Sequence, residues 1–265
     1  MQAIVIGTVV VAVIGLLIGL MLIAVGSKFK VEVDEREAQV RECLPGNNCG
    51  ACGYAGCDAM AGAIAQGEAP VNGCPVGGTP VAEKIGRIMG VEAGAIERNY
   101  AYVKCSGSCD FTSNAAEYVG IKDCSAAVTS GIAPTSCDYG CLGFGSCVAA
   151  CQFDAIHVVN GVAKVDRSKC VACGKCVAAC PRHLIELVPE KSTFAVACSN
   201  KDKGPQVKKV CSTGCIGCRL CVKQCESEAI TVEDNVAHID YEKCIGCGKC
   251  AEKCPSKVIH NEHIA

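Results

Sequence analysis

The sequence predicts a series of small α+β modules behind one N-terminal helix, and three observations support this fold class. An apolar run without charged residues covers residues 3–25. Beyond it, most of the 26 cysteines stand in short, glycine-rich groups, and the chain has no Trp and few other aromatic residues from which to build one large core. The C-terminal half contains a stretch that occurs twice, which is typical of a duplicated supersecondary unit.

Residues 3–25 form the predicted N-terminal helix. Roughly 20 consecutive apolar residues are enough to cross the hydrocarbon core of a bilayer. Lys28 and Lys30 follow the run and no positive side chain precedes it, whereas a secretory signal begins with positive charge. Because positive charge collects on the cytoplasmic side, we expect a single-pass anchor of the cell (plasma) membrane. The helix would contact the lipid bilayer, and the rest of the chain would lie on the cytoplasmic side.

The cysteine pattern favours bound metal over disulfide bonds. Many cysteines are separated by only two residues, too close to bridge one another, and such runs are typical of metal thiolate sites. Disulfides are also rare where cytosolic thiols stay reduced. We therefore expect metal to supply part of the folding energy. The net charge of −2 excludes a strongly basic protein that binds nucleic acid.

The first metal motif follows a short charged linker. Its stretch CGACGYAGC ends at Cys57, and CPVGG begins at Cys74. Glycines between thiolates let the backbone wrap around a cubane cluster and direct amide N–H groups at its sulfurs. Zinc is the alternative, but zinc sites usually combine two CxxC pairs, which this spacing does not match. The predicted ligands of this [4Fe-4S] module are Cys49, Cys52, Cys57 and Cys74.

The repeat of the C-terminal half is the strongest motif. The stretch AIHVVNGVAKVDRSKCVACGKC returns as AITVEDNVAHIDYEKCIGCGKC, with the flanking cysteines at the same offsets. In each copy, two alternating strands around a turn at Asn160-Gly161 or Asp234-Asn235 predict a β-hairpin. The spacing CxxCxxCxxxC is the signature of bacterial two-cluster ferredoxins, in which the fourth cysteine binds the other cluster. We therefore expect two ferredoxin-like units.

This crossed pattern predicts two [4Fe-4S] clusters in each unit. In the second unit, the predicted sets are Cys225, Cys244, Cys247 with Cys250, and Cys215, Cys218, Cys221 with Cys254. In the first unit, the set that follows the pattern is Cys151, Cys170, Cys173 and Cys176.

The first unit departs from the pattern at one ligand. Cys141 aligns with Cys215, but Phe144 stands where the second unit has Cys218. An extra turn could bring a nearby cysteine into the vacant corner. The expected second set of this unit is Cys137, Cys141, Cys147 and Cys180.

Other cysteines lie between these groups. Short strand-like stretches end at Cys105 and Cys198, and each is followed further on by another cysteine. Two such arms could lie side by side and hold a sixth cluster, or the cysteines could be buried free thiols. The candidates, of which four would be needed, are Cys105, Cys109, Cys124, Cys198 and Cys211. Cys43 lies outside the first motif as a spare thiol.

The order of these features resembles the B subunit of the Rnf complex, a membrane-bound ferredoxin:NAD oxidoreductase. The resemblance covers nearly the whole chain, and KCSGSC, GIKDC and YGCLGFGSC resemble the long form with an extra domain found in clostridia-like anaerobes. It implies that the five clusters, or six, pass electrons from reduced soluble ferredoxin to the other membrane and peripheral subunits. Those subunits would couple the flow to Na⁺ or H⁺ translocation, so the chain would be an enzyme only as part of this translocase, without catalytic side chains of its own. The alternative is an iron–sulfur subunit of another membrane redox complex, such as a hydrogenase or a quinone reductase.

Two groups of lysines are candidates for a ferredoxin-docking surface. Charged runs are usually just solvated faces, whereas a docking surface would speed the approach of an acidic partner. The two groups are Lys201, Lys203, Lys208 and Lys209, and Lys243, Lys249, Lys253 and Lys257.

The chain thus divides into seven expected segments. They are a transmembrane anchor (1–27), a linker (28–42), a [4Fe-4S] module (43–90), a Cys-containing insert (91–135), ferredoxin-like unit 1 (136–190), a connecting arm (191–212) and ferredoxin-like unit 2 (213–265).

Overall fold

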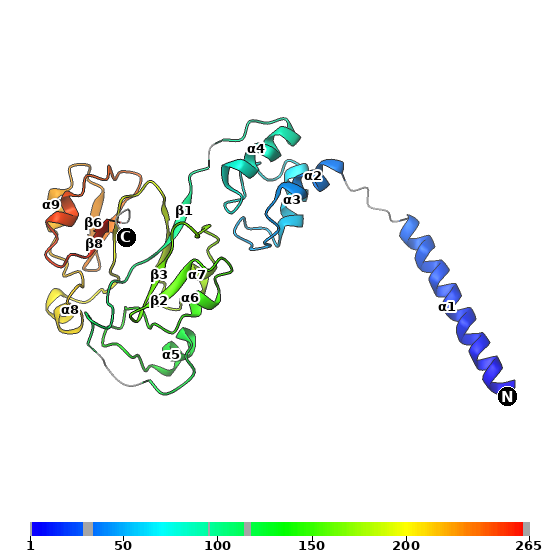
Figure 1. Ribbon diagram of the computed structural model, residues 1–265, viewed down its shortest axis with the longest axis horizontal. Helices are drawn as coiled ribbons and strands as arrows, with labels where there is room; N and C mark the ends of the chain where they lie inside the picture. The colour runs from blue at the N-terminus through cyan, green and yellow to red at the C-terminus, as the bar shows by residue number, and fades with distance from the viewer. Residues whose placement is uncertain (1, 29–33, 95, 114–117, 262–265) are drawn as a thin grey trace.

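The structure is a computed structural model that describes residues 2–28, 34–94, 96–113 and 118–261. Figure 1 shows an elongated molecule with helix α1 (Gln2–Lys28) at one end and the β-strands at the other. Among the helices of the described residues, none is both long enough and apolar enough to cross a bilayer. The anchor expected at residues 3–25 therefore stays a prediction.

Three helices form a small module behind α1. They are α2 (Glu35–Cys43), α3 (Cys57–Ala65) and α4 (Gly78–Met89). Asp34 caps α2 by accepting a hydrogen bond of 2.9 Å from the Arg36 N–H, which satisfies one of the free donors at the helix start. Met60, Ile64 and Ile85 are almost fully buried between the helices. Each contributes about 1.5–3 kcal/mol of stability by leaving water.

Two hairpins confirm the predicted repeat. The first pairs β2 (Ile156–Val159) with β3 (Val162–Val165), and the second pairs β6 (Ile230–Glu233) with β7 (Val236–Ile239). The turn residues Asn160 and Gly161 both have positive φ, as do Asp234 and Asn235, which is what a two-residue type I′ turn requires. Short helices follow the cysteine loops of both units: α6 (Ser146–Ala149), α7 (Lys175–Ala179), α9 (Leu220–Gln224) and α10 (Lys249–Glu252).

Each unit has a second pair of strands that uses a segment from outside the repeat. Strand β1 (Asn99–Val103) of the insert pairs with β4 (Ile185–Pro189), and β5 (Phe194–Val196) of the connecting arm pairs with β8 (Ile259–Asn261). The registers correspond, because Val103 lies opposite Ile185 and Val196 lies opposite Ile259. The insert and the arm are thus structural parts of the two units, and they also carry helices α5 (Cys124–Ser130) and α8 (Gly204–Val210).

The two arms lie side by side. Beyond the end of β1, the Ser106 N–H donates to the Ala197 carbonyl at 3.0 Å, and the Ser113 N–H donates to the Val210 carbonyl at 3.1 Å. The segment after β1 is therefore joined to the segment after β5 along much of its length, and the two ferredoxin-like units meet at this junction. From the sequence, the segments ending at Cys105 and Cys198 could lie side by side, and these bonds confirm that they do.

Candidate metal centres

Four cavities among the described residues are each lined by at least four cysteines. We number the candidate centres along the molecule. Site II is Cys151, Cys170, Cys173 and Cys176; site III is Cys124, Cys141, Cys147 and Cys180; site IV is Cys105, Cys137, Cys198 and Cys211; site V is Cys215, Cys218, Cys221 and Cys254. The sets predicted at sites II and V are brought together without change.

Two further groups are recognised by electrostatic contact between their thiols. Site I is the predicted set Cys49, Cys52, Cys57 and Cys74, and site VI is the predicted set Cys225, Cys244, Cys247 and Cys250. Burial raises the pKa of Cys74, and the charges of Cys52 and Cys57 raise it further. Burial likewise raises the pKa of Cys250 to about 11, with a contribution from the other three cysteines of site VI. Burial raises the pKa of Cys173 in site II and the charge of Cys49 contributes to the rise, so site I lies near site II.

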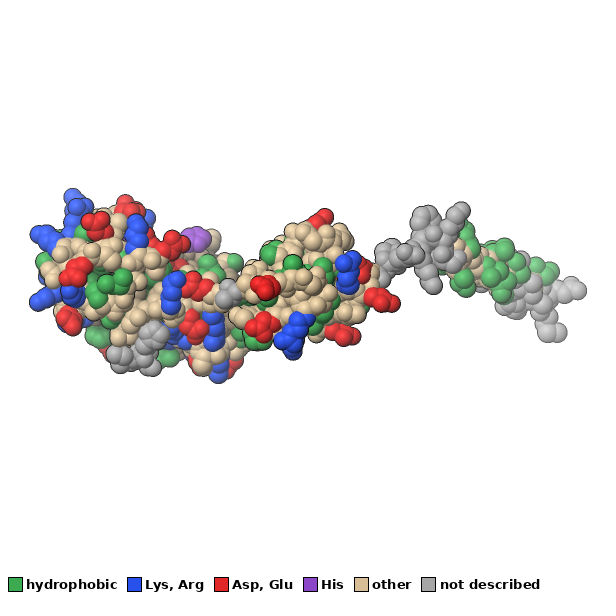
Figure 2. Space-filling view, turned by 90° about the horizontal axis from the view of Figure 1, so that it is seen from above, with side chains coloured by type: hydrophobic (Ala, Val, Ile, Leu, Met, Phe, Trp, Pro, Cys, Tyr) green, Lys and Arg blue, Asp and Glu red, His purple; other side chains and the backbone are tan. Residues whose placement is uncertain are grey.

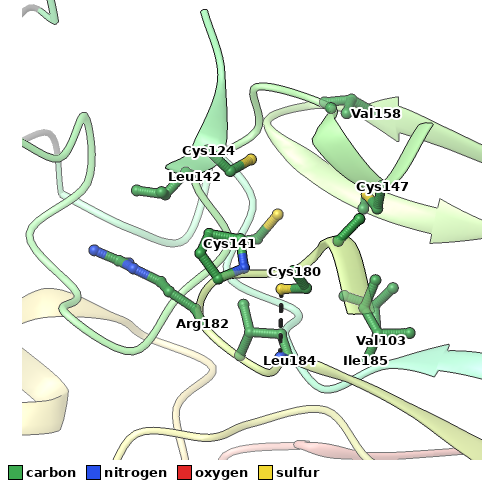
Figure 3. Close-up of a pocket in the computed structure, with 14 residues that line it drawn as sticks. Val103, Cys124, Cys141, Leu142, Cys147, Val158, Cys180, Arg182, Leu184 and Ile185 are labelled. Carbon is green, nitrogen blue, oxygen red and sulfur yellow. Dashed lines mark hydrogen bonds between the residues drawn. The ribbon is translucent and has the colours of Figure 1, made fainter. Parts of the chain in front are cut away.

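Site III differs from the sequence expectation at one position. Cys124, from the start of α5, lies with Cys141, Cys147 and Cys180, and Figure 3 shows the four side chains around one space. Cys137, which was expected there, instead lines the cavity of site IV.

Hydrogen bonds explain this exchange. The Cys124 N–H donates to Ser146 Oγ at 2.8 Å, and Ser146 Oγ donates to the carboxylate of Asp123 at 2.7 Å. This network holds the start of α5 against the start of α6, beside Cys147. The Arg182 guanidinium donates to the carbonyls of Cys137 (2.9 Å) and Gly140 (2.7 Å), which fixes the Cys137 loop at the junction. No sequence motif marks the residues of either contact, so the spacing of the cysteines could not have identified them.

Several site cysteines accept backbone hydrogen bonds through their sulfurs, at N···S distances of 3.3–3.4 Å. The N–H groups of Gly77, Ala101, Leu184 and Ala229 donate to Cys74, Cys170, Cys180 and Cys225 respectively, and those of Cys141 and Cys215 donate to Cys105 and Cys198. Such bonds are used to hold cluster thiolates and to set their potentials. The donor chemistry of the cavities therefore fits [4Fe-4S] clusters.

A single metal ion needs ligands that converge on one point, unlike a [4Fe-4S] cluster. Among the described residues, no three His, Cys, Asp or Glu side chains form a group that could hold one metal ion. A [4Fe-4S] cluster instead takes its thiolates from around a larger space.

Burial raises the pKa of many site thiols. Cys147 in site III and Cys198 in site IV reach about 12, and Cys105, Cys176 and Cys221 reach about 11. For Cys147, the neighbouring thiols of Cys141 and Cys124 add to the effect of burial. Without metal these thiols are therefore protonated at neutral pH. Because iron binds the thiolate, cluster insertion must release their protons.

Two cysteines lie outside the six sites. Cys109 is exposed, and Cys43 is partly buried at the end of α2. The sequence patterns also gave no indication of Asn200, whose buried amide contacts a site IV sulfur; nothing in its sequence context marks it.

A duplicated fold of this kind, with cysteine-lined cavities and N–H···S bonds, defines an iron–sulfur protein of the ferredoxin type. Three family models match the chain: "Putative Fe-S cluster" at residues 44–76, "4Fe-4S binding domain" at residues 163–186 and "4Fe-4S dicluster domain" at residues 214–258. They cover site I and parts of both ferredoxin-like units. The presence of iron–sulfur modules in all three regions is thus confirmed.

Similarity to curated proteins extends over nearly the whole chain. The B subunit of the Na(+)-translocating ferredoxin:NAD(+) oxidoreductase complex of Acetobacterium woodii is 45% identical over 92% of this chain and 73% of its own length. The B subunit of the ion-translocating oxidoreductase complex of Methanosarcina acetivorans is 41% identical over 88% of this chain and 89% of its own. That of the proton-translocating ferredoxin:NAD(+) oxidoreductase complex of Clostridium ljungdahlii is 41% identical, over 91% and 85%. The chain belongs to the family of Rnf complex B subunits.

Proposed function

We propose that the chain is the iron–sulfur electron-transfer subunit of an ion-translocating ferredoxin:NAD oxidoreductase and relays electrons from reduced ferredoxin to the other subunits. The observation that carries the proposal is the set of cysteine-lined cavities with amide donors on their sulfurs. Similarity to B subunits of this complex supports it. Those relatives are named for Na⁺ in one case and for protons in another, so family membership leaves both coupling ions open.

Six [4Fe-4S] clusters are proposed, one in each of sites I to VI. Relative to the sequence expectation, Cys124 takes the place of Cys137 in site III, and Cys137 becomes a ligand of site IV. When bound, each cluster takes up and releases one electron at a potential that its surroundings set. The chain supplies thiolates, amide donors and apolar walls such as Val103 and Ile185 of site III.

A membrane anchor is proposed for residues 3–25, with the clusters on the cytoplasmic side. Its support is the uncharged apolar sequence within the 27-residue helix α1 and the lysines that follow it. The same anchor would bring the chain to the membrane subunits of the complex.

Soluble ferredoxin is proposed to dock on unit 2. Cys218 and Cys247, proposed ligands of sites V and VI, are exposed, and so is Ile245, two residues before Cys247. In unit 1 the equivalent Val171 and Cys173 are partly buried. Figure 2 shows Lys and Arg side chains, interspersed with Asp and Glu, at the end of the molecule that unit 2 forms. Clusters close to exposed lysines, such as those at the end of α8, suit an acidic electron donor.

Charge reversal on α8 tests this docking surface. Lys208 and Lys209 are exposed at the end of α8, which packs through Val207 against Gly214 beside site V. We expect Lys208→Glu with Lys209→Glu to slow reduction by ferredoxin about tenfold at low salt, because steering contributes about 10- to 1,000-fold to such rates. Stopped-flow absorbance measures the rate, and Lys84→Glu on α4 is the matched control. A rate that changes with neither salt nor the α8 charges would contradict docking there.

Iron content tests the proposed function as a whole. The full chain, purified anaerobically in detergent, should contain about 24 iron and 24 acid-labile sulfide atoms, at about four of each per cluster. Dithionite should produce EPR signals of magnetically coupled reduced clusters. Stoichiometric zinc without an EPR signal would overturn the proposal. Co-purification with hydrogenase or quinone reductase subunits would instead support a role in another redox complex.

A further inference from the structure

The cavity of site IV is lined by five cysteines; Cys141 also lines site III, and the other four, the site IV set, come equally from the two ferredoxin-like units. Cys105 and Cys137 belong to the first unit and its arm, and Cys198 and Cys211 belong to the second. The positions correspond, because Cys137 precedes Cys141 by the same spacing as Cys211 precedes Cys215. Cys105 and Cys198 each lie two residues beyond the matching strands β1 and β5. The four cysteines therefore form two corresponding pairs, one from each unit, in an approximate two-fold relation.

Site IV is also bonded directly to a neighbouring site on each side. The N–H of Cys141, a site III cysteine, donates to the sulfur of Cys105 at 3.4 Å. In the matching contact, the N–H of Cys215, a site V cysteine, donates to the sulfur of Cys198 at 3.3 Å. One hydrogen bond thus joins a site IV cysteine to a site III cysteine, and another joins a site IV cysteine to a site V cysteine, so a bonded route between the two units runs through site IV.

Asn200 breaks the two-fold relation. Its counterpart two residues after Cys105 is Gly107, which has no side chain. The Asn200 amide Nδ2 donates to the sulfur of Cys137 at 3.4 Å, and its backbone N–H donates to the sulfur of Cys198 at 3.5 Å. One residue of the second unit therefore donates to thiolates that come from both units.

Burial and a hydrogen bond fix the orientation of the Asn200 side-chain amide. Asn200 is 2% exposed and is one of two buried polar residues in the described part of the chain. Its Oδ1 accepts a hydrogen bond of 2.8 Å from the Asp202 N–H, which orients Nδ2 toward the cluster cavity. Burial raises the pKa of the Cys137 thiol, and the Asn200 amide opposes that rise, as a donor that favours the charged sulfur does.

We propose that the side-chain amide of Asn200 sets the reduction potential of a relay cluster in site IV that joins the two ferredoxin-like units. The proposal rests on the proposed function, because it requires a cluster in site IV. A reduced cluster carries one more negative charge than an oxidised one, so a donor to its sulfur stabilises the reduced form and raises the potential. By raising the potential, Asn200 allows the site IV cluster to accept electrons from the clusters of either unit.

Redox potentiometry followed by EPR on the anaerobic full chain tests the proposal. Cys211→Ala identifies the site IV signal as the component that it removes. Asn200→Leu and Asn200→Asp both lack the amide donor, whereas the Asp variant keeps an oxygen for the Asp202 N–H and so guards against a folding defect. Asn200→Leu should lower the site IV potential by about 59 mV, which corresponds to a tenfold change in the one-electron equilibrium constant, and the added carboxylate of Asn200→Asp should lower it at least as far.

Ser199→Ala is the matched control, because Ser199 also lines the site IV cavity but its hydroxyl donates to the Lys104 carbonyl. It should leave all potentials unchanged, and the Asn200 variants should leave the other clusters unchanged. A site IV potential that moves no further in the Asn200 variants than in Ser199→Ala overturns the role of Asn200 while the six clusters stand. If Cys211→Ala removes no iron and no signal, the sixth cluster itself is absent, and both proposals fail at that site.

Discussion

Replacing Cys124 and Cys137 together with Ala is expected to remove about eight iron atoms per chain, because the two cysteines are proposed ligands of different four-iron clusters. Replacing Cys137 and Cys211 together should remove only about four, since both belong to site IV. Iron and acid-labile sulfide, determined on anaerobically purified full-length protein, measure the difference.

Cys109→Ala is the control for these variants, because Cys109 is exposed and lines none of the cysteine cavities described above. It should retain all the iron of the parent chain. The grouping would be refuted if Cys124→Ala alone left the iron content intact. It would also be refuted if replacing Cys137 and Cys211 together removed about eight iron atoms, the sum for two four-iron clusters. The second result would return Cys137 to the first unit's own cluster, as its place in the sequence suggests.

Removal of the clusters is expected to unfold both ferredoxin-like units. Their cores consist largely of Ala, Val and the site cysteines, with few large side chains such as Ile156 and Ile230. A unit this small gains only about 3–5 kcal/mol at most from an apolar core, and bound metal adds folding energy directly. After chelation and oxidation, amide hydrogen exchange in β2, β3, β6 and β7 should approach the rate of an unfolded chain.

The module of α2, α3 and α4 provides an internal comparison. Its core contains Met60, Ile64 and Ile85, all at most 1% exposed, and the ion pair between Arg41 and Asp58 at 2.6 Å joins α2 to α3. We expect its helices to keep more of their protection than the hairpins do. Hairpin amides that stay protected after the iron is gone would show that the polypeptide core alone is sufficient.

Local patterns were enough to predict the repeated part of the fold. The turn pairs Asn160-Gly161 and Asp234-Asn235, set between alternating apolar residues, predicted both hairpins, and the structure has them with matching registers. The cysteines that line the cavities of sites II and V were also predicted from spacing, because CxxCxxC loops place their cysteines by local geometry.

The pairing of β1 with β4 and of β5 with β8 could not be read in this way. These strands pair with partners far along the chain or beyond a whole unit, and neither β1 nor β5 lies within the repeated stretch. Their short apolar sequences are compatible with many partners, so only the packed structure selects one.

By itself, the sequence predicted small modules, cysteines in groups of four and a pair of such groups in each ferredoxin-like unit. Each of these features depends on residues close together in the chain. Only the tertiary structure decided that Cys124 lies in site III and that Cys137 lies at the junction. The reason is physical. Those positions depend on the Ser146–Asp123 network and on the Arg182 contacts, which bring together segments whose separation in the sequence carries no pattern.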